Sequence, residues 1–499
     1  MLFPTAAFSF AFLPIVLLAF FLIARRFEYG AATWLFLASV FFYGYWMPAF
    51  TLLLLASIVV NFYVGGVISR RVGSGSARDR ALAKVALIFG ITLNLATLVY
   101  FKYANFFIDN LNTGFGLHVD IGRVILPVGI SFYTFTQIAF LADTFSKGIK
   151  EYKFAHYGLF VTYFPHLIAG PVLHHGQMMP QFAAASTYRP KLANLAAGLA
   201  IFALGLAKKI VLADGVAPYA DAIFNATDTG IHPTFVEAWI GTLAYTFQIY
   251  FDFSGYSDMA IGLGLLFNIR LPLNFNSPYK SLNIVEFWRR WHMSLSTFLR
   301  DYLYIPLGGG RHGPVRRHVN LMLTMLLGGL WHGASWTFVF WGALHGGYLI
   351  VNHTFAATMA RRAVVLERAK AWRLLSMAMT FLCVVVAWVF FRAHSFSGAA
   401  LMLQSLSPYG AGTEVDGVHA MLWNSGLDLA RAWWWCAALA LIAFVAPNSN
   451  AIGDAVLRRC LVPGGLRCFV LGASAAAMIL LIVLNEARDS VSAFIYFNF

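Results

Sequence analysis

Residues 6–24 read AAFSFAFLPIVLLAFFLIA and carry no charged side chain, and Arg25 and Arg26 follow them directly. A helix of about 20 apolar residues spans the hydrocarbon core of a bilayer, so this stretch indicates a membrane-spanning helix. A cleavable signal peptide has its positive charges before the apolar stretch, whereas here they come after it. We therefore expect a retained first membrane helix whose N-terminus lies outside the cell membrane, opposite the cytoplasm.

Further apolar runs of similar length recur along the chain, at residues 31–46, 48–69, 84–105, 124–143, 374–394, 428–446 and 468–485. Basic residues gather between alternate runs, and Lys and Arg near membrane helices stay on the cytoplasmic side. We therefore place five basic clusters on the cytoplasmic side of the membrane: Arg25 and Arg26; Arg70, Arg71, Arg78, Arg80 and Lys84; Lys147, Lys150 and Lys153; Arg361, Arg362, Arg368, Lys370 and Arg373; and Arg458, Arg459 and Arg467.

The overall composition agrees with these runs. Of the 499 residues, 60% are hydrophobic and only 11% are charged, and the mean hydropathy is +0.70. Soluble domains carry about 25% charged residues, so a soluble enzyme is excluded. The net charge of +14 suits anionic lipid headgroups, and no basic segment belongs to a soluble fold that could read nucleic acid. We predict an all-α polytopic membrane protein with one domain over residues 1–499.

The region between residues 154 and 318 has a less regular pattern. Its apolar runs are interrupted by the pair Lys208-Lys209 and by prolines at positions 165, 171, 180, 272, 278 and 306. Two crossings, four crossings or re-entrant segments all satisfy the flanking orientation. Irregular backbone at membrane depth survives only inside protein or beside a water-filled cavity, so we expect a buried polar site here.

Three polar clusters stand out against the apolar background, since a charge at the centre of a membrane helix costs roughly 2.5–3.5 kcal/mol on insertion scales. They are residues 248–258, residues 286–309 and residues 328–345. The first contains Asp252 and Asp258, which suggest helix capping or structural hydrogen bonds more than a cation site. No spacing of His, Cys, Asp and Glu resembles a zinc site, and no phosphate-binding glycine loop or G-x-S-x-G elbow occurs.

His332 is the sharpest candidate, because it lies in a run from about 319 to 354 without Asp, Glu, Lys or Arg. Burial disfavours the charged imidazolium, so we expect a neutral imidazole that can act as a general base. The alternative is a structural histidine that hydrogen-bonds a backbone carbonyl. His292 shares a predicted helix face with Arg289 and Ser296, which fits an interfacial anchor helix. His345 faces away from His332 on a continuous helix, so a shared role requires a helix break.

The motifs around both histidines resemble those of a known family. The segment WRRWHMSLS at residues 288–296, with RDY at 300–302 and PLGG at 306–309, resembles the membrane-bound O-acyltransferase family. The segment WHGASW at residues 331–336 resembles the signature histidine segment of that family. Three further segments resemble the bacterial alginate O-acetyltransferase branch of that family: MLF at 1–3, PVGISFY at 127–133 and AGP at 169–171.

The resemblance implies a helical bundle of roughly 11–13 transmembrane helices around a tunnel, with re-entrant or broken central segments. It implies that His332 is the catalytic residue and that His292 is its orienting or stabilising partner. No cofactor would be permanently bound; the co-substrate would be an acyl thioester, either acetyl-CoA or an acyl carrier, at the cytoplasmic mouth.

The resemblance further implies a multi-pass protein of the bacterial inner membrane with a periplasmic N-terminus, which passes the acetyl group outward for O-acetylation of an exopolysaccharide such as alginate. The implied partners are a periplasmic SGNH-hydrolase-like acetyltransferase, the polysaccharide synthesis machinery, a cytoplasmic donor protein and membrane lipids, with no nucleic acid. Two alternatives stay open at this point. One is a D-alanyl transferase of the teichoic-acid type, and the other is a polytopic transporter with a buried histidine.

Overall fold

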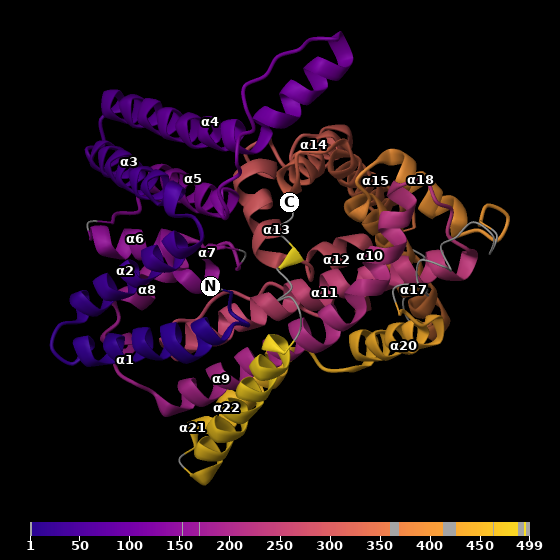
Figure 1. Cartoon of the computed structure of the whole chain (residues 1–499). Helices are drawn as coiled ribbons and strands as arrows, with labels where there is room; N and C mark the ends of the chain where they lie inside the picture. Colours follow the sequence, from indigo (N-terminus) through magenta and orange to yellow (C-terminus); the bar gives the residue numbers. More distant parts are fainter. Residues whose placement is uncertain are drawn as a thin grey trace. The chain divides into compact units, whose positions relative to one another are not determined.

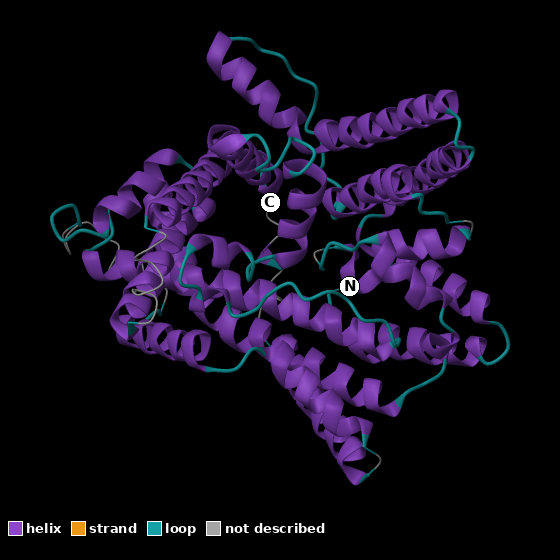
Figure 2. Ribbon diagram, turned by 180° about the vertical axis from the view of Figure 1, so that it is seen from behind, coloured by secondary structure: helices purple, strands orange, loops and turns teal. Residues whose placement is uncertain are grey.

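The computed structural model describes residues 2–151, 153–168, 170–359, 369–412, 426–462, 464–487 and 494–495. Within these ranges the chain is helix and loop without any strand (Figure 2). The predicted all-α polytopic class is therefore confirmed. Ala169 of the AGP motif and the basic residues Arg361, Arg362 and Arg368 lie outside the described residues.

The helices divide into two compact units (Figure 1). The first comprises Met1–Leu204, Tyr256–Leu273 and Ile452–Phe497, and the second comprises Gly205–Gly255 and Asn274–Ala451, with the last two residues of the chain. The prediction of a single domain stays a prediction. All of the histidines singled out above lie in the second unit.

The helices up to residue 213, in chain order, are η1 (Ala7–Phe12), α1 (Leu13–Ala24), α2 (Glu28–Trp46), α3 (Pro48–Gly73), α4 (Ala77–Phe115), α5 (Ile130–Lys147), α6 (Phe154–Thr162), α7 (Phe164–Leu167), α8 (His175–Ala183), η2 (Ala185–Tyr188), α9 (Leu192–Ala207) and η3 (Lys208–Ala213). Those that follow are α10 (Asp214–Asp228), α11 (Phe235–Leu266), η4 (Pro278–Lys280), α12 (Ile284–Trp288), α13 (Met293–Leu299), η5 (Arg300–Tyr304), α14 (Gly313–His332), α15 (Trp336–Thr358), α17 (Lys370–Arg392), α18 (Phe396–Ser405), α20 (Leu429–Val445), α21 (Ser449–Leu461) and α22 (Gly465–Glu486).

Six helical runs in the described chain are long and apolar enough to cross a membrane: Ala7–Ala24, Pro48–Gly73, Ala77–Phe115, Leu192–Asp228, Lys370–Arg392 and Gly465–Glu486. The pair α20 and α21, bent by 56°, is a seventh candidate if it acts as one span. These helices establish a multi-pass membrane protein. The total of roughly 11–13 crossings and the periplasmic N-terminus stay predictions.

Buried amides connect α3, α4 and α5 in the first unit. Asn61 and Asn94 hydrogen-bond each other in both directions, at 3.2 Å and 2.7 Å, and the Ser57 hydroxyl donates to Gln137 at 3.0 Å. Apolar helices gain no hydrophobic energy from associating in lipid, so hydrogen bonds between helices help to hold them together. This network accounts for polar residues inside otherwise apolar runs.

The sequence pattern suggested that Lys208-Lys209 interrupts a membrane helix, but the helix continues through this pair. Both lysines lie in the π-helical turn η3, and Leu192–Asp228 runs through it as one helical segment. Lys209 is buried and its Nζ pairs with Asp214 Oδ1 at 2.7 Å and Asp252 Oδ1 at 2.9 Å. Because these carboxylates neutralise its charge, the helix can continue.

Candidate active site

His332 is the last residue of α14, and its side chain is buried. The helix ends there because Gly333 is extended and Ser335 starts α15 by accepting a hydrogen bond from the Thr337 N–H at 3.3 Å. A β-carbon on Gly333 would lie 2.3 Å from the Phe338 ring, so this turn has no room for a side chain. The break thus fixes His332 at a helix end.

The two helices on either side of the break pack closely side by side (Figure 1). A β-carbon on Gly329 would lie 2.3 Å from the Phe338 carbonyl oxygen, and one on Gly342 would lie 2.3 Å from the Met325 carbonyl oxygen. Paired glycines let helix backbones approach in this way. The glycines of the third polar cluster therefore bring α15 against α14 beside His332.

Aromatic rings enclose the His332 imidazole. Trp341 meets it edge-on with ring centroids 5.1 Å apart, and Phe391 of α17 lies at 5.2 Å. Trp388 stacks on Trp341 at 5.8 Å, so α15 and α17 supply adjoining walls. These rings bury the imidazole.

His292 lies next to His332, with ring centroids 6.4 Å apart and an angle of 57° between the rings. The predicted continuous helix through His292 is wrong: α12 ends at Trp288, α13 begins at Met293, and His292 has a left-handed backbone with φ of 44°. Arg289 therefore does not share a helix face with it. The imidazole is also fully buried, which contradicts the interpretation of His292 as an interfacial anchor.

Asn274 holds the unusual backbone at His292 in place. Its carbonyl oxygen accepts from the Met293 N–H at 2.9 Å, and its Oδ1 accepts from the Ser294 N–H at 3.3 Å and the Ser294 hydroxyl at 2.8 Å. A left-handed conformation costs a residue other than glycine about 1–3 kcal/mol, so it needs such support. Asn274 is itself fully buried.

The same Asn274 oxygen determines the tautomer of His292. The Ser294 backbone N–H can only donate, so the side-chain atom of Asn274 that it faces is the oxygen. His292 Nδ1 lies 3.1 Å from that oxygen and therefore donates its hydrogen to it. In the neutral ring this leaves the lone pair on Nε2, so Nε2 accepts hydrogen bonds.

His345 also belongs to this cluster. The sequence allowed it a role shared with His332 only if the helix between them is broken, and the helix is broken between α14 and α15. Trp341 lies between His332 and His345, with its ring centroid 4.7 Å from that of His345. The Trp288 Nε1–H donates to His345 Nδ1 at 3.3 Å, which places the His345 hydrogen on Nε2. His345 thus connects α12 to the wall that faces His332.

The first polar cluster contributes less directly. Phe253 packs edge-on against His292 at 4.7 Å, while Asp252 is tied up in the ion pair with Lys209. Asp258 does not cap a helix start, because it lies well inside α11. Within the described chain, no group of three or more His, Cys, Asp and Glu side chains is placed to hold a metal ion.

A cavity of about 470 Å³ adjoins α12 and α13, the two short helices on either side of His292. Trp288 and Met293, which flank the break at His292, line it, and so do the cationic side chains Arg289 and Arg300, of which Arg300 pairs with Asp301 at 2.6 Å. None of the residues that line it is acidic. The cavity therefore suits an anionic ligand.

Asn274 is the site residue that the motifs did not reveal. It stands in LPLNFNSPY at residues 271–279, between two of the polar clusters, and is 18 residues away from His292 in the chain. The only local signal is a pair of amide side chains between two prolines in an apolar region. That signal indicates a turn, but not which side chain the turn supports.

Comparison with known proteins gives consistent matches. The sequence model of the membrane-bound O-acyltransferase family matches residues 91–396. The peptidoglycan O-acetyltransferase of Helicobacter pylori is 42% identical over 433 residues, which cover 81% of this chain and 80% of the relative. A Pseudomonas aeruginosa protein named "Probable alginate O-acetylase" is 43% identical, covering 82% and 75% of the two chains. The teichoic acid D-alanyltransferase of Bacillus subtilis is 25% identical and covers 55% of this chain.

Proposed function

The chain belongs to the membrane-bound O-acyltransferase family, and we propose that it passes an acetyl group from a cytoplasmic thioester donor to an acceptor hydroxyl, for O-acetylation of an alginate-like exopolysaccharide outside the inner membrane. Membership makes it an O-acyltransferase, which overturns the transporter alternative. An acetyl donor is favoured over D-alanine because the O-acetylating relatives are more similar and cover more of the chain.

The observation that carries the proposal is the pair of buried histidines beside a cationic cavity. Rings with centroids 6.4 Å apart are close enough to contact one acceptor molecule, since catalytic hydrogen bonds span about 2.6–3.2 Å. An acceptor placed there can donate its reacting hydroxyl to one imidazole and a second hydroxyl to the other. The cavity with Arg289 and Arg300 supports an anionic donor, such as coenzyme A or the phosphopantetheine arm of a carrier protein.

The two histidines differ in their position relative to helix ends, and this supports different roles. His332 is at the C-terminal end of α14, where the helix dipole stabilises a positive charge by about 0.3–2 kcal/mol. His292 precedes the N-terminal end of the short helix α13, where a positive charge gains nothing of that kind. His332 is therefore the residue better placed to take up a proton.

The tautomer of His292 narrows its role. With its lone pair on Nε2, neutral His292 accepts a hydrogen bond there but cannot donate one to the reacting carbonyl oxygen. We assign it to orienting the acceptor through a second hydroxyl group, because the single hydrogen of the reacting hydroxyl goes to His332, and not to stabilising the oxyanion.

The proposed reaction is direct transfer. The hydroxyl oxygen attacks the thioester carbonyl carbon while its proton passes to His332. The new C–O bond forms, the C–S bond breaks, and the proton leaves His332 for the departing thiolate sulfur.

The experiment uses liposomes that contain the purified chain and labelled acetyl-CoA. Label should pass to an added hydroxyl acceptor with the wild type and not with His332→Ala. In cells that lack the chain, only the wild type should restore acetyl groups on the polysaccharide. Transfer of D-alanine from a carrier protein, with none from acetyl-CoA, would support the runner-up function. Partners such as a periplasmic SGNH-hydrolase-like acetyltransferase belong to the same proposal.

A further inference from the structure

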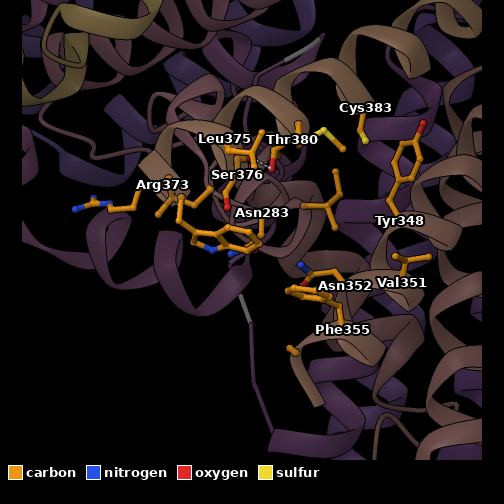
Figure 3. Close-up of a pocket in the computed structure, with 15 residues that line it drawn as sticks. Asn283, Tyr348, Val351, Asn352, Phe355, Arg373, Leu375, Ser376, Thr380 and Cys383 are labelled. Carbon is orange, nitrogen blue, oxygen red and sulfur yellow. Dashed lines mark hydrogen bonds between the residues drawn. The ribbon is translucent and has the colours of Figure 1, made fainter. Parts of the chain in front are cut away.

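A second cavity of about 600 Å³ lies between α15 and α17, next to the start of α12 (Figure 3). None of the residues that line it also lines the cavity beside His292. Its size is within the range of ligand sites, which is about 300–1,000 Å³. Nothing in the proposed acetyl transfer uses it.

The walls of this groove are mostly apolar and face outward. Val351 is 67% exposed, and Leu375 and Met379 are each 54% exposed. They lie on α15 and on α17, and α17 is long and apolar enough to span the membrane. Exposed apolar side chains on such a helix indicate contact with lipid chains.

One end of the groove is basic. Figure 3 shows Arg373 at one end, and Tyr348 and Cys383 at the other. Arg373 and Cys383 are ten residues apart on α17, which is about 15 Å along a helix. Lys370 lies one turn before Arg373, and none of the described residues that line the groove is acidic.

Apolar walls with a basic end match an amphiphilic ligand that has an anionic headgroup. An apolar channel of this length accommodates part of an acyl chain, and the guanidinium at its end matches a phosphate. Trp372, also in the lining, is the residue type enriched at the membrane–water interface. Basic pockets between membrane helices on the cytoplasmic side bind anionic headgroups. A coenzyme A molecule would instead have to place its polar nucleotide against apolar walls.

We infer that this groove binds one anionic glycerophospholipid, with an acyl chain between α15 and α17 and its phosphate at Arg373. The lipid supports the two helices that enclose His332, because α15 carries Trp341 while α17 carries Trp388 and Phe391. It acts as a structural ligand and takes no part in the proposed transfer.

The test measures lipid retention. The full chain is equilibrated with vesicles of equal parts phosphatidylglycerol and phosphatidylcholine, re-extracted in mild detergent, and examined by native mass spectrometry. Arg373→Gln should lower the ratio of retained phosphatidylglycerol to phosphatidylcholine about five-fold, the effect of one basic residue near an anionic surface. The control is Arg70→Gln, at the exposed basic end of α3, which should leave the ratio unchanged.

Two further variants separate binding from folding. Arg373→Lys keeps the charge and should retain most of the phosphatidylglycerol. Ser376→Trp fills the groove and should lower retention of both lipids in protein that remains monodisperse. Equal ratios for Arg373→Gln and Arg70→Gln would overturn the inference, as would displacement of the retained lipid by acetyl-CoA. Equal ratios would leave the acetyl-transfer proposal unaffected, because that proposal rests on the other cavity. Displacement by acetyl-CoA would instead move the donor site to this groove and leave the transfer reaction itself in place.

Discussion

Replacing Asn274 tests whether the orientation of His292 matters for transfer. Asn274→Ala removes the oxygen that accepts from His292 Nδ1, from the Ser294 N–H and from the Ser294 hydroxyl. Each buried donor left without a partner costs about 1–3 kcal/mol. The two Ser294 donors alone match or outweigh the support that the left-handed backbone at His292 requires, which is about 1–3 kcal/mol. The imidazole should then no longer be fixed in one place or in one tautomer.

The expected result is a loss of acetyl transfer of at least about tenfold, because each 1.36 kcal/mol of lost transition-state stabilisation is tenfold in rate. Asn274→Asp keeps an oxygen in the same place and should retain more activity than Asn274→Ala. The assay is transfer from labelled acetyl-CoA in liposomes, normalised to folded protein measured by thermal unfolding and size-exclusion chromatography.

The control is Asn320→Ala. Asn320 is also buried and in the second unit, and its side chain donates to the Leu307 and Gly309 carbonyl oxygens at 3.2 Å and 2.9 Å. It should lower stability comparably but lower transfer less, because it holds no histidine. If folded Asn274→Ala transferred acetyl groups at the wild-type rate, the argument from the His292 tautomer would be refuted.

The remaining predictions concern the histidines and the helix hairpin. His332→Ala and His332→Asn should both lose transfer by at least the 10²–10⁴-fold that general-base catalysis supplies; a purified, folded variant that retains more than about a tenth of wild-type transfer would contradict the role of His332. His292→Asn should transfer at a rate between those of the wild type and His292→Ala, since an amide still hydrogen-bonds; near-wild-type transfer by both variants would make His292 structural only. Gly342→Ala should lower the unfolding temperature, because its β-carbon would lie 2.3 Å from the Met325 carbonyl oxygen. The control Gly347→Ala should not lower it, because the space around Gly347 is open. Equal unfolding temperatures for the two variants would show that α14 and α15 do not need this close approach.

The sequence was sufficient to predict the all-helical membrane class and to single out His332 and His292. The class follows from composition and from apolar runs, which depend on physics local to each segment. The two histidines were found through short motifs, and the structure places their rings together. Their chemical roles stay predictions until the variants above are measured.

Periodicity was a poor guide at two places in the middle of the chain. Lys208 and Lys209 suggested an interruption, but the carboxylates of Asp214 and Asp252 neutralise Lys209 and the helix continues. Asp214 is five residues away, whereas Asp252 comes from α11 and is not visible from the local pattern of charges. Asp258 was interpreted as a helix cap because an apolar run follows it, yet α11 begins much earlier, at Phe235.

The helix breaks at His332 and at His292 explain both why the site was hard to predict and why it could work as proposed. A continuous helix through His332 would direct His345 away and would remove the end of the helix dipole from the imidazole. The break after α14 instead leaves His332 at a negative helix end and lets α15 fold back with Trp341 against it. At His292 the break exposes backbone N–H groups that Asn274 satisfies, and the same oxygen orients the ring. Each histidine thus takes its proposed role from how the broken backbone around it is stabilised, and a variant that restores a regular helix at either place should lose transfer even with both imidazoles present.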